Sequence, residues 1–89
     1  MTNHTIEFDL WKDDLPFDIQ LEPECLIFKV TPNNELRFVA ICDDNDFTWA
    51  VRGNPKNGGI QLFPVGMGNY EINIYENGIL LEDWFKYMR

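Results

Sequence analysis

Apolar and polar residues alternate one for one over much of this sequence. Apolar side chains take every second position from Ile6 to Leu10 and again from Tyr70 to Ile74. A period of two is that of a β-strand with one buried face, whereas an amphipathic helix repeats every 3.6 residues. Helical spacing of apolar residues occurs only between Leu81 and Met88. We therefore expect an all-β fold with room for one short C-terminal helix.

Turn-forming residues divide the chain into short segments. The best specified are Leu26–Thr31, Glu35–Cys42 and Asp46–Arg52, which are rich in β-favouring residues and are separated by turns of Pro, Asn and Asp. If each turn joins neighbouring strands, the three segments form a meander with one apolar face. That face would carry Leu26, Phe28, Val30, Leu36, Phe38, Ala40, Cys42, Phe47, Trp49 and Val51.

The flanking segments complete the expected fold. Thr5–Trp11 is typical of an edge strand, and Lys12–Glu24 of a loop that contains a short extended piece. Asn77-Gly78 is a strong signal for a type I′ hairpin, which would place Tyr75 opposite Leu80. We expect six to seven short strands in one domain, residues 1–89, folded as a small antiparallel β-sandwich or a partly open barrel.

One short sequence pattern near the C-terminal hairpin also occurs in other β-sandwich proteins. The residues of 68–74 read Gly-x-Tyr-x-Ile-x-Ile. This pattern resembles the late hairpin of many bacterial and phage immunoglobulin-like sandwiches. It spans seven residues and assigns no family.

The negative charge is concentrated in the first half of the chain. Eleven of the fifteen Asp and Glu residues lie between Met1 and Asp46, so the net charge of −8 resides there. Such a field repels the phosphate backbone of nucleic acids and anionic membrane surfaces, and it attracts basic protein surfaces. We therefore expect no direct nucleic acid and no membrane as partner. The same acids would also serve as a solvated surface that keeps the chain in solution.

The residues needed for catalysis or metal binding are scarce. Serine is absent, and His4 is the single histidine. The acidic run Asp43–Asp46 lacks the spacing of a calcium-binding loop, so a turn explains it better. Cys25 and Cys42 are too few for a disulfide scaffold, and we expect both to be reduced and shielded. The sequence thus predicts no enzyme, no cofactor and no metal site.

No cleavable leader or membrane span is recognisable. Thr2 to Thr5 are polar, and no apolar run approaches the ~20 residues that cross a bilayer. We expect a cytoplasmic protein.

Aromatic residues exceed what one face of so small a sheet requires. Trp and Tyr are preferred anchors of protein interfaces. We therefore expect a non-enzymatic module that binds a basic protein, such as a small inhibitor, immunity or counter-defence protein capping a nuclease or another nucleic-acid-handling partner. The alternative is a structural sandwich subunit or accessory of a larger assembly such as a phage particle, in which neighbours bury the edge strands and the second face. A homo-oligomer insensitive to salt would support this alternative. The surplus aromatics are Trp11, Phe17, Trp49, Tyr75, Trp84 and Tyr87. The candidate partner-binding residues are Asp13, Asp14, Asp18, Asp43, Asp44, Asp46, Tyr75, Leu80 and Trp84.

Overall fold

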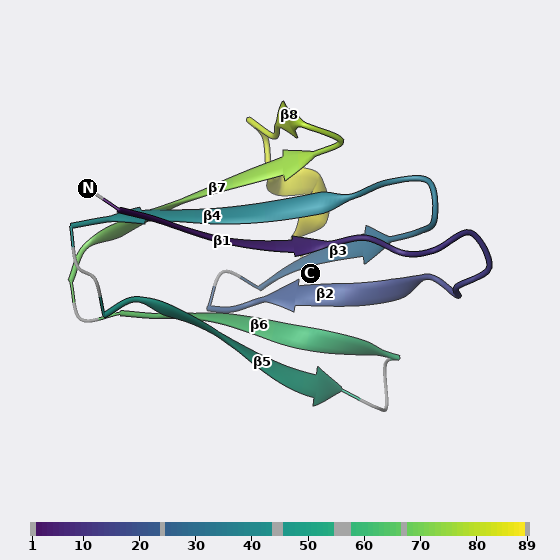
Figure 1. The fold of residues 1–89 in the computed structure, drawn as a ribbon, viewed down its shortest axis with the longest axis horizontal. Coiled ribbons are helices and arrows are strands. Elements are labelled where there is room, and N and C mark those ends of the chain that lie inside the picture. The colour runs from purple at the N-terminus through teal and green to yellow at the C-terminus, as the bar shows by residue number, and fades with distance from the viewer. Residues whose placement is uncertain (1, 24, 44–45, 55–57, 67, 89) are drawn as a thin grey trace.

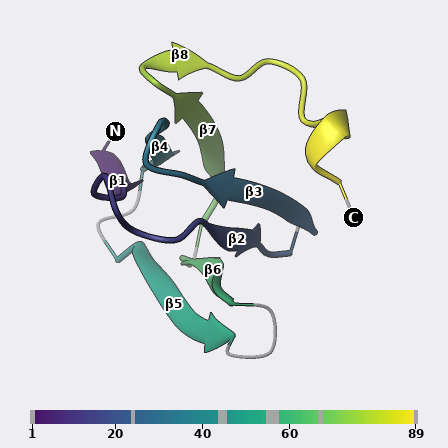
Figure 2. The same cartoon turned by 90° about the vertical axis from the view of Figure 1, so that its right-hand side faces the viewer.

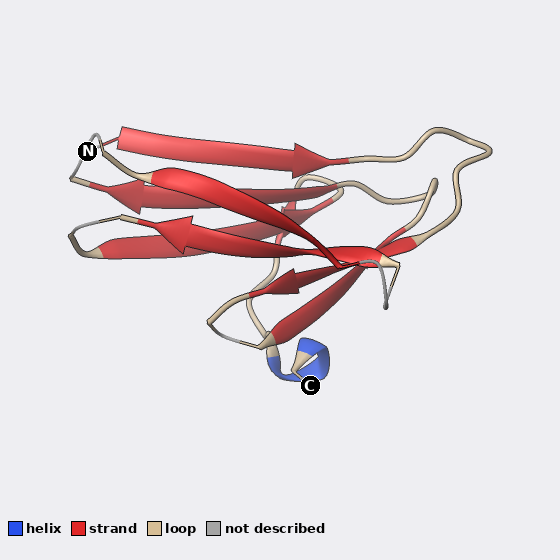
Figure 3. Cartoon of the chain, turned by 90° about the horizontal axis from the view of Figure 1, so that it is seen from below, coloured by secondary structure: helices blue, strands red, loops and turns tan. Residues whose placement is uncertain are grey.

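The structure is a computed structural model that describes residues 2–23, 25–43, 46–54, 58–66 and 68–88. Within these residues two sheets pack face to face, with a single 3-10 turn, η1 (Phe85–Tyr87), near the C-terminus (Figures 1 and 3). The strands are β1 (Thr2–Phe8), β2 (Phe17–Leu21), β3 (Leu26–Val30), β4 (Leu36–Cys42), β5 (Thr48–Asn54), β6 (Gly59–Val65), β7 (Tyr70–Glu76) and β8 (Ile79–Leu80).

Each sheet contains four strands. The first has the order β1-β4-β7-β8 and the second the order β3-β2-β6-β5 (Figure 2). All neighbours are antiparallel except β2 and β6, which run parallel. The expected all-β sandwich is confirmed, with eight strands in place of six or seven and with one parallel pair.

The core lies between the two sheets. Phe38 of β4 stands at its centre, with ring centroids 5.9 Å from Phe8, 5.5 Å from Phe28 and 6.3 Å from Trp49. Because Phe28 and Trp49 belong to the second sheet, these contacts join the two layers. The buried apolar residues are Ile19, Leu21, Leu26, Phe28, Val30, Leu36, Phe38, Ala40, Cys42, Phe47, Leu62, Ile72 and Ile74.

The expected meander is wrong, because its three strands do not pair with one another. The set of side chains expected to face inward is nevertheless largely correct. β3 and β5 lie in the second sheet, while β4 lies in the first between β1 and β7. Both connections therefore pass from one sheet to the other, and packed sheets lie about 10 Å apart. Eight of the ten residues expected to face inward are buried, and Trp49 is half-buried. Val51 faces the same way but is 52 % exposed, because β5 is the last strand of its sheet.

The segments at either end of the chain differ in detail from expectation. β1 is an edge strand, as expected, but it ends at Phe8 and leaves Trp11 in the following loop. The extended piece expected within the loop Lys12–Glu24 is β2, an interior strand with fully buried Ile19 and Leu21. A parallel neighbour far away in the sequence, β6, holds it there, and local patterns cannot reveal such a partner.

The predicted hairpin is confirmed. Asn77 and Gly78 have φ angles of 54° and 82°, as a type I′ turn requires, and Tyr75 lies opposite Leu80. β8 ends after two residues, and the chain then reaches η1. None of the helical segments in the described ranges has the length and apolar character to cross a membrane.

Candidate functional site

The acidic residues do not form one array, because they lie at opposite ends of the sandwich. In the antiparallel pair of β1 and β4, Phe8 lies opposite Leu36 and Thr2 opposite Cys42. The loop after β1 and the loop after β4 are thus separated by the length of a seven-residue strand, about 20 Å at ~3.3 Å per residue. Figure 1 shows them at the right and the left of the molecule.

The predicted acids divide accordingly. Asp13 and Asp14 are exposed in the β1–β2 loop, whereas Asp43 and Asp46 are exposed at the opposite end. Asp44 lies outside the described residues. Asp18, near the start of β2, is 3.2 Å from Lys29 Nζ on the neighbouring strand β3. The candidate aspartates that the structure describes therefore lie at two separate ends of the sandwich.

Further acids join Asp13 and Asp14 at their end of the molecule. The ring of Phe8, which ends β1, is 6.5 Å from the ring of Phe17, which begins β2. Leu36, opposite Phe8, also lies opposite Glu76. The same end therefore includes loops 9–16 and 31–35 and the β7–β8 turn. We call it the acidic end, and its carboxylates are those of Asp9, Asp13, Asp14, Asp18, Glu35 and Glu76.

Loop 9–16 is held by a four-residue turn. The amide of Asp14 donates to the carbonyl oxygen of Trp11 at 3.0 Å, and the amide of Trp11 donates to Oδ2 of Asp14 at 2.8 Å. This reciprocal pair fixes the backbone, but it leaves the indole of Trp11 83 % exposed and the side chain of Leu15 84 % exposed. Two large apolar side chains are thus exposed to solvent beside Asp13 and Asp14.

The rest of the acidic end is tied together by side-chain hydrogen bonds. The amide of Glu35 donates to Oδ1 of Asn77 at 2.9 Å, and the amide of Asn77 donates to the carbonyl oxygen of Glu35 at 3.0 Å. Nδ2 of Asn34 donates to the carboxylate of Glu76 at 3.0 Å and to the carbonyl oxygen of Lys29 at 3.1 Å. These bonds link loop 31–35 to the β7–β8 turn, so this part of the surface has a defined shape.

The three apolar candidates for partner binding, Tyr75, Leu80 and Trp84, do not lie together in one exposed patch. Tyr75 lies on the outer face of the first sheet, and Leu80 is exposed beside it. Trp84 instead is half-buried against the core, and its Nε1 donates to the carbonyl oxygen of Leu81 at 3.1 Å. Part of its surface is therefore already covered by this chain.

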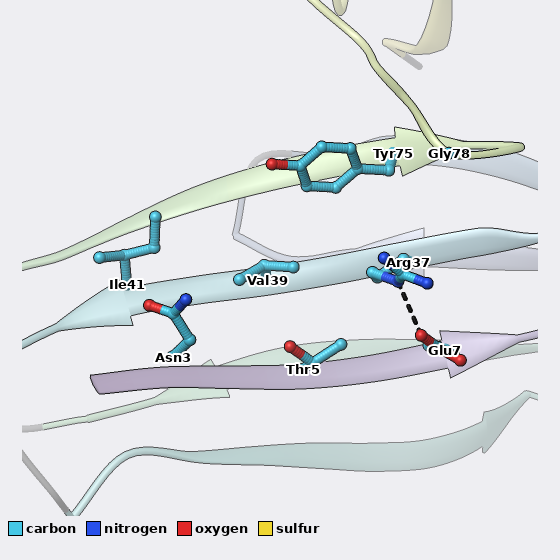
Figure 4. A pocket seen from close by; sticks show the side chains of 8 residues that line it. All are labelled: Asn3, Thr5, Glu7, Arg37, Val39, Ile41, Tyr75 and Gly78. Atoms are coloured by element: carbon cyan, nitrogen blue, oxygen red, sulfur yellow. Dashed lines mark hydrogen bonds and ion pairs between the residues drawn. The ribbon is translucent and has the colours of Figure 1, made fainter. Parts of the chain in front are cut away.

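The outer face of the first sheet is hollowed. Tyr75 borders a shallow depression of about 580 Å³, with Val39 and Ile41 in its floor (Figure 4). Glu7 and Arg37 form an ion pair at one end of it, with Oε1 and Nε 2.7 Å apart (Figure 4). Their charges are mutually satisfied, which leaves this surface close to neutral. Its other lining residues are Asn3, Thr5 and Gly78.

The remaining candidates for chemistry are the single histidine and the two cysteines. The ring of His4 lies 5.2 Å from that of Phe47, and its Nε2 is 3.2 Å from Oγ1 of Thr2. Cys42 is buried, but Cys25 is exposed, so the expectation that both thiols are shielded is wrong for Cys25. Its place in the exposed connection between β2 and β3 explains the difference. Across the described ranges no group of three or more His, Cys, Asp or Glu side chains is placed to hold a metal ion.

The most prominent side chains of the acidic end are absent from the sequence-based set of partner-binding residues. Trp11 belongs to the surplus aromatics but was expected within a strand, and Leu15 was not singled out. A signal for them exists in the sequence. The period of two breaks at Leu10-Trp11, and Trp11 and Leu15 then flank Lys12 and two aspartates in a stretch that ends at Pro16. Large apolar residues in such an acidic loop have no strand partner to cover them.

Comparison with protein-family models, with curated proteins and with solved structures finds no match to this chain.

Proposed function

We propose that this protein is a non-enzymatic binding module whose acidic end docks on a basic surface of another protein. The observation that carries the proposal is the display of Trp11 and Leu15, more than four-fifths exposed, on a hydrogen-bonded turn that also presents Asp13 and Asp14. Large exposed apolar side chains among charges are typical of interaction surfaces.

The two kinds of side chain would act at different stages of binding. Carboxylates at the acidic end would accelerate encounter with a basic partner and orient it. Trp11 and Leu15 would then enter an apolar recess, where burial of one large side chain contributes roughly 1.5–3 kcal/mol. Tryptophan is also the residue type most enriched among the side chains that dominate binding energy. Fixing the turn beforehand lowers the entropy lost on binding.

The favoured partner is a nuclease or another nucleic-acid-handling protein. Such proteins carry basic grooves that bind phosphates, and an array of carboxylates can occupy the same groove. The protein would then act as a small inhibitor, immunity or counter-defence protein. A cytoplasmic location fits the two free cysteines, Cys25 and Cys42.

Affinity capture with matched variants tests this proposal. The immobilised wild-type chain should retain a basic protein from a host extract in a stoichiometric complex that duplex DNA and salt both displace. Trp11→Ala and Asp13→Lys should each weaken retention about tenfold or more. The controls are Val65→Ala, an exposed apolar residue of β6 outside the acidic end, and Asp43→Lys, the same charge reversal at the opposite end.

The pattern across the four variants decides the result. Retention that is unchanged by Trp11→Ala and Asp13→Lys, or reduced equally by the controls, would contradict a docking role for the acidic end.

One feature favours the alternative function, a subunit or accessory of a larger assembly. The edge of β5 is open to another strand, and edge strands of this kind readily pair with a second chain.

A further inference from the structure

Each sheet of the sandwich has two edge strands, and the four edges are covered to different degrees in the described residues. On β1, Nε1 of Trp49 donates to the carbonyl oxygen of His4 at 2.9 Å. On β3, Leu26 forms a bridge with Met88, and the ring of Tyr87 lies 4.5 Å from that of Phe28. β8 is only two residues long. Covering or shortening edges in this way prevents unwanted strand pairing.

β5 has no such protection in the described part of the chain. Its seven residues pair with β6 on one side, and no other described segment donates to or accepts from its backbone. The strand contains no proline, lysine or acid, the usual guards of an edge, and Arg52 is its one charged residue. Val51 lies opposite the fully buried Leu62 and faces the core side, yet it is 52 % exposed. The flank of the core is therefore open beside Val51, whereas Trp49 closes it nearer the start of β5 by its bond to His4.

The charge distribution indicates what could cover this edge. From Phe47 to Tyr70 the chain has no Asp or Glu, although its net charge is −8. Two copies can thus approach through β5 without bringing carboxylates of this region together. A strongly basic partner finds no carboxylate on β5 to hold it. The strand itself is well suited to pair with its own copy.

If β5 pairs antiparallel with β5 of a second copy around a two-fold axis, the residues that face each other across the two strands are compatible. With Ala50 opposite Ala50 of the second copy, Arg52 lies opposite Thr48, which keeps the two positive charges apart. Val51 then lies opposite Trp49 of the second copy, a pair of a β-branched and an aromatic residue that is favourable across strands. Such an interface uses the same patch on both copies, which is the commonest arrangement in dimers.

The direction of β5 also separates the acidic ends. β2 begins at the acidic end, β6 runs parallel to β2, and β5 runs antiparallel to β6. β5 therefore finishes at the acidic end. In an antiparallel dimer the two acidic ends point in opposite directions, so their repulsion is small.

We propose that β5 pairs antiparallel with β5 of a second copy around a two-fold axis beside Ala50, which joins the two β3-β2-β6-β5 sheets into one. The proposal gives the alternative function a specific contact, and it does not rest on the acidic end as a docking surface.

Sedimentation velocity of the full chain at increasing concentration tests the dimer. Wild type should shift from monomer to dimer, and Val51→Lys should raise the dissociation constant about tenfold or more, because it places two ammonium groups at the joint. Ile79→Lys is the matched control, since Ile79 is 71 % exposed in the other sheet and the charge change is the same. It should dimerise like wild type. Circular dichroism should show both variants folded.

Disulfide formation tests the register. In a Cys25→Gly background, which removes the exposed thiol, Ala50→Cys should give a cross-linked dimer under mild oxidation, because facing Cβ atoms of paired strands lie about 4.5–5.5 Å apart. Thr5→Cys, exposed on β1, should not.

A wild type that stays monomeric at every concentration, or a dimer that survives Val51→Lys, overturns the proposal. Capture of a basic partner by the acidic end should be unaffected by Val51→Lys, so the two proposals can fail separately.

Discussion

The indole Nε1 of Trp49 donates a hydrogen bond to the main-chain oxygen of His4, 2.9 Å away in the opposite sheet. Trp49 belongs to β5, the edge of one sheet, and His4 to β1, the edge of the other. The same indole ring packs 6.3 Å from Phe38 and 5.3 Å from Phe47. One side chain thus closes this side of the sandwich by both packing and hydrogen bonding.

Trp49→Phe should separate these two contributions. Phenylalanine keeps an aromatic ring against the core but cannot donate to His4. We expect the free energy of unfolding in urea to fall by about 1 kcal/mol, the usual net value of one hydrogen bond. Trp84→Phe is the control, because its Nε1 donates to Leu81 only three residues away and joins no two sheets. If both variants lose the same amount, the bond to His4 does not hold the sheets together.

The strands and their inward faces could be predicted from the sequence because alternation is a local property. Phe28, Phe38 and Phe47 were correctly expected to face inward, and all three are buried. Their partners could not be predicted, because facing across a core and pairing within a sheet give the same alternation. After β3 the chain passes to the other sheet, because β4 pairs there with β1 and β7, which lie far away in the sequence.

The same limit applies to the candidate site. Asp13 and Asp43 belong to similar acidic stretches of the sequence, and nothing local shows that β1 and β4 run in opposite directions, so that Asp13 and Asp43 lie at opposite ends. Trp84 belongs to a segment with helical spacing that follows a strand. Its position therefore depends on where the chain turns after Leu80, which the sequence pattern does not show. Leu81 donates its amide to the carbonyl oxygen of Ile74 at 2.8 Å, which directs the chain back over the core side.

Asn77 combines a backbone role with a side-chain role, and two substitutions can distinguish them. Asn77→Gly keeps the positive φ of the turn but loses the hydrogen bond from the amide of Glu35 to Oδ1, so we expect a loss of about 1 kcal/mol. Asn77→Ala should lose roughly 1 kcal/mol more, because a Cβ disfavours the left-handed region. Thermal or urea unfolding measures both. Equal losses would show that the turn relaxes without strain.

Gly59 allows β6 to begin close against β2. A Cβ built at Gly59 would overlap the backbone carbonyl oxygen of Asp18, whereas one built at Gly53 has nothing within 4 Å. Gly59→Ala should therefore destabilise the protein by about 1–3 kcal/mol, as overpacking does, because backbone must move. Gly53→Ala, one pair further along on the neighbouring strand β5, should stay within about 0.5 kcal/mol of wild type. A tolerated Gly59→Ala would mean that the two strands can separate at this point without cost.

The two cysteines should react at very different rates with a thiol reagent. Cys25 is exposed in the β2–β3 connection, whereas Cys42 is 4 % exposed in the core. We expect one thiol per chain to be labelled rapidly in the native state, and the second only when the chain unfolds. Cys25→Gly should remove the rapid phase and leave stability unchanged or slightly raised, because the φ of 60° at this residue suits glycine. A rapid phase that persists in Cys25→Gly would show that the reagent reaches Cys42 in the folded protein, and that the core beneath β4 opens readily.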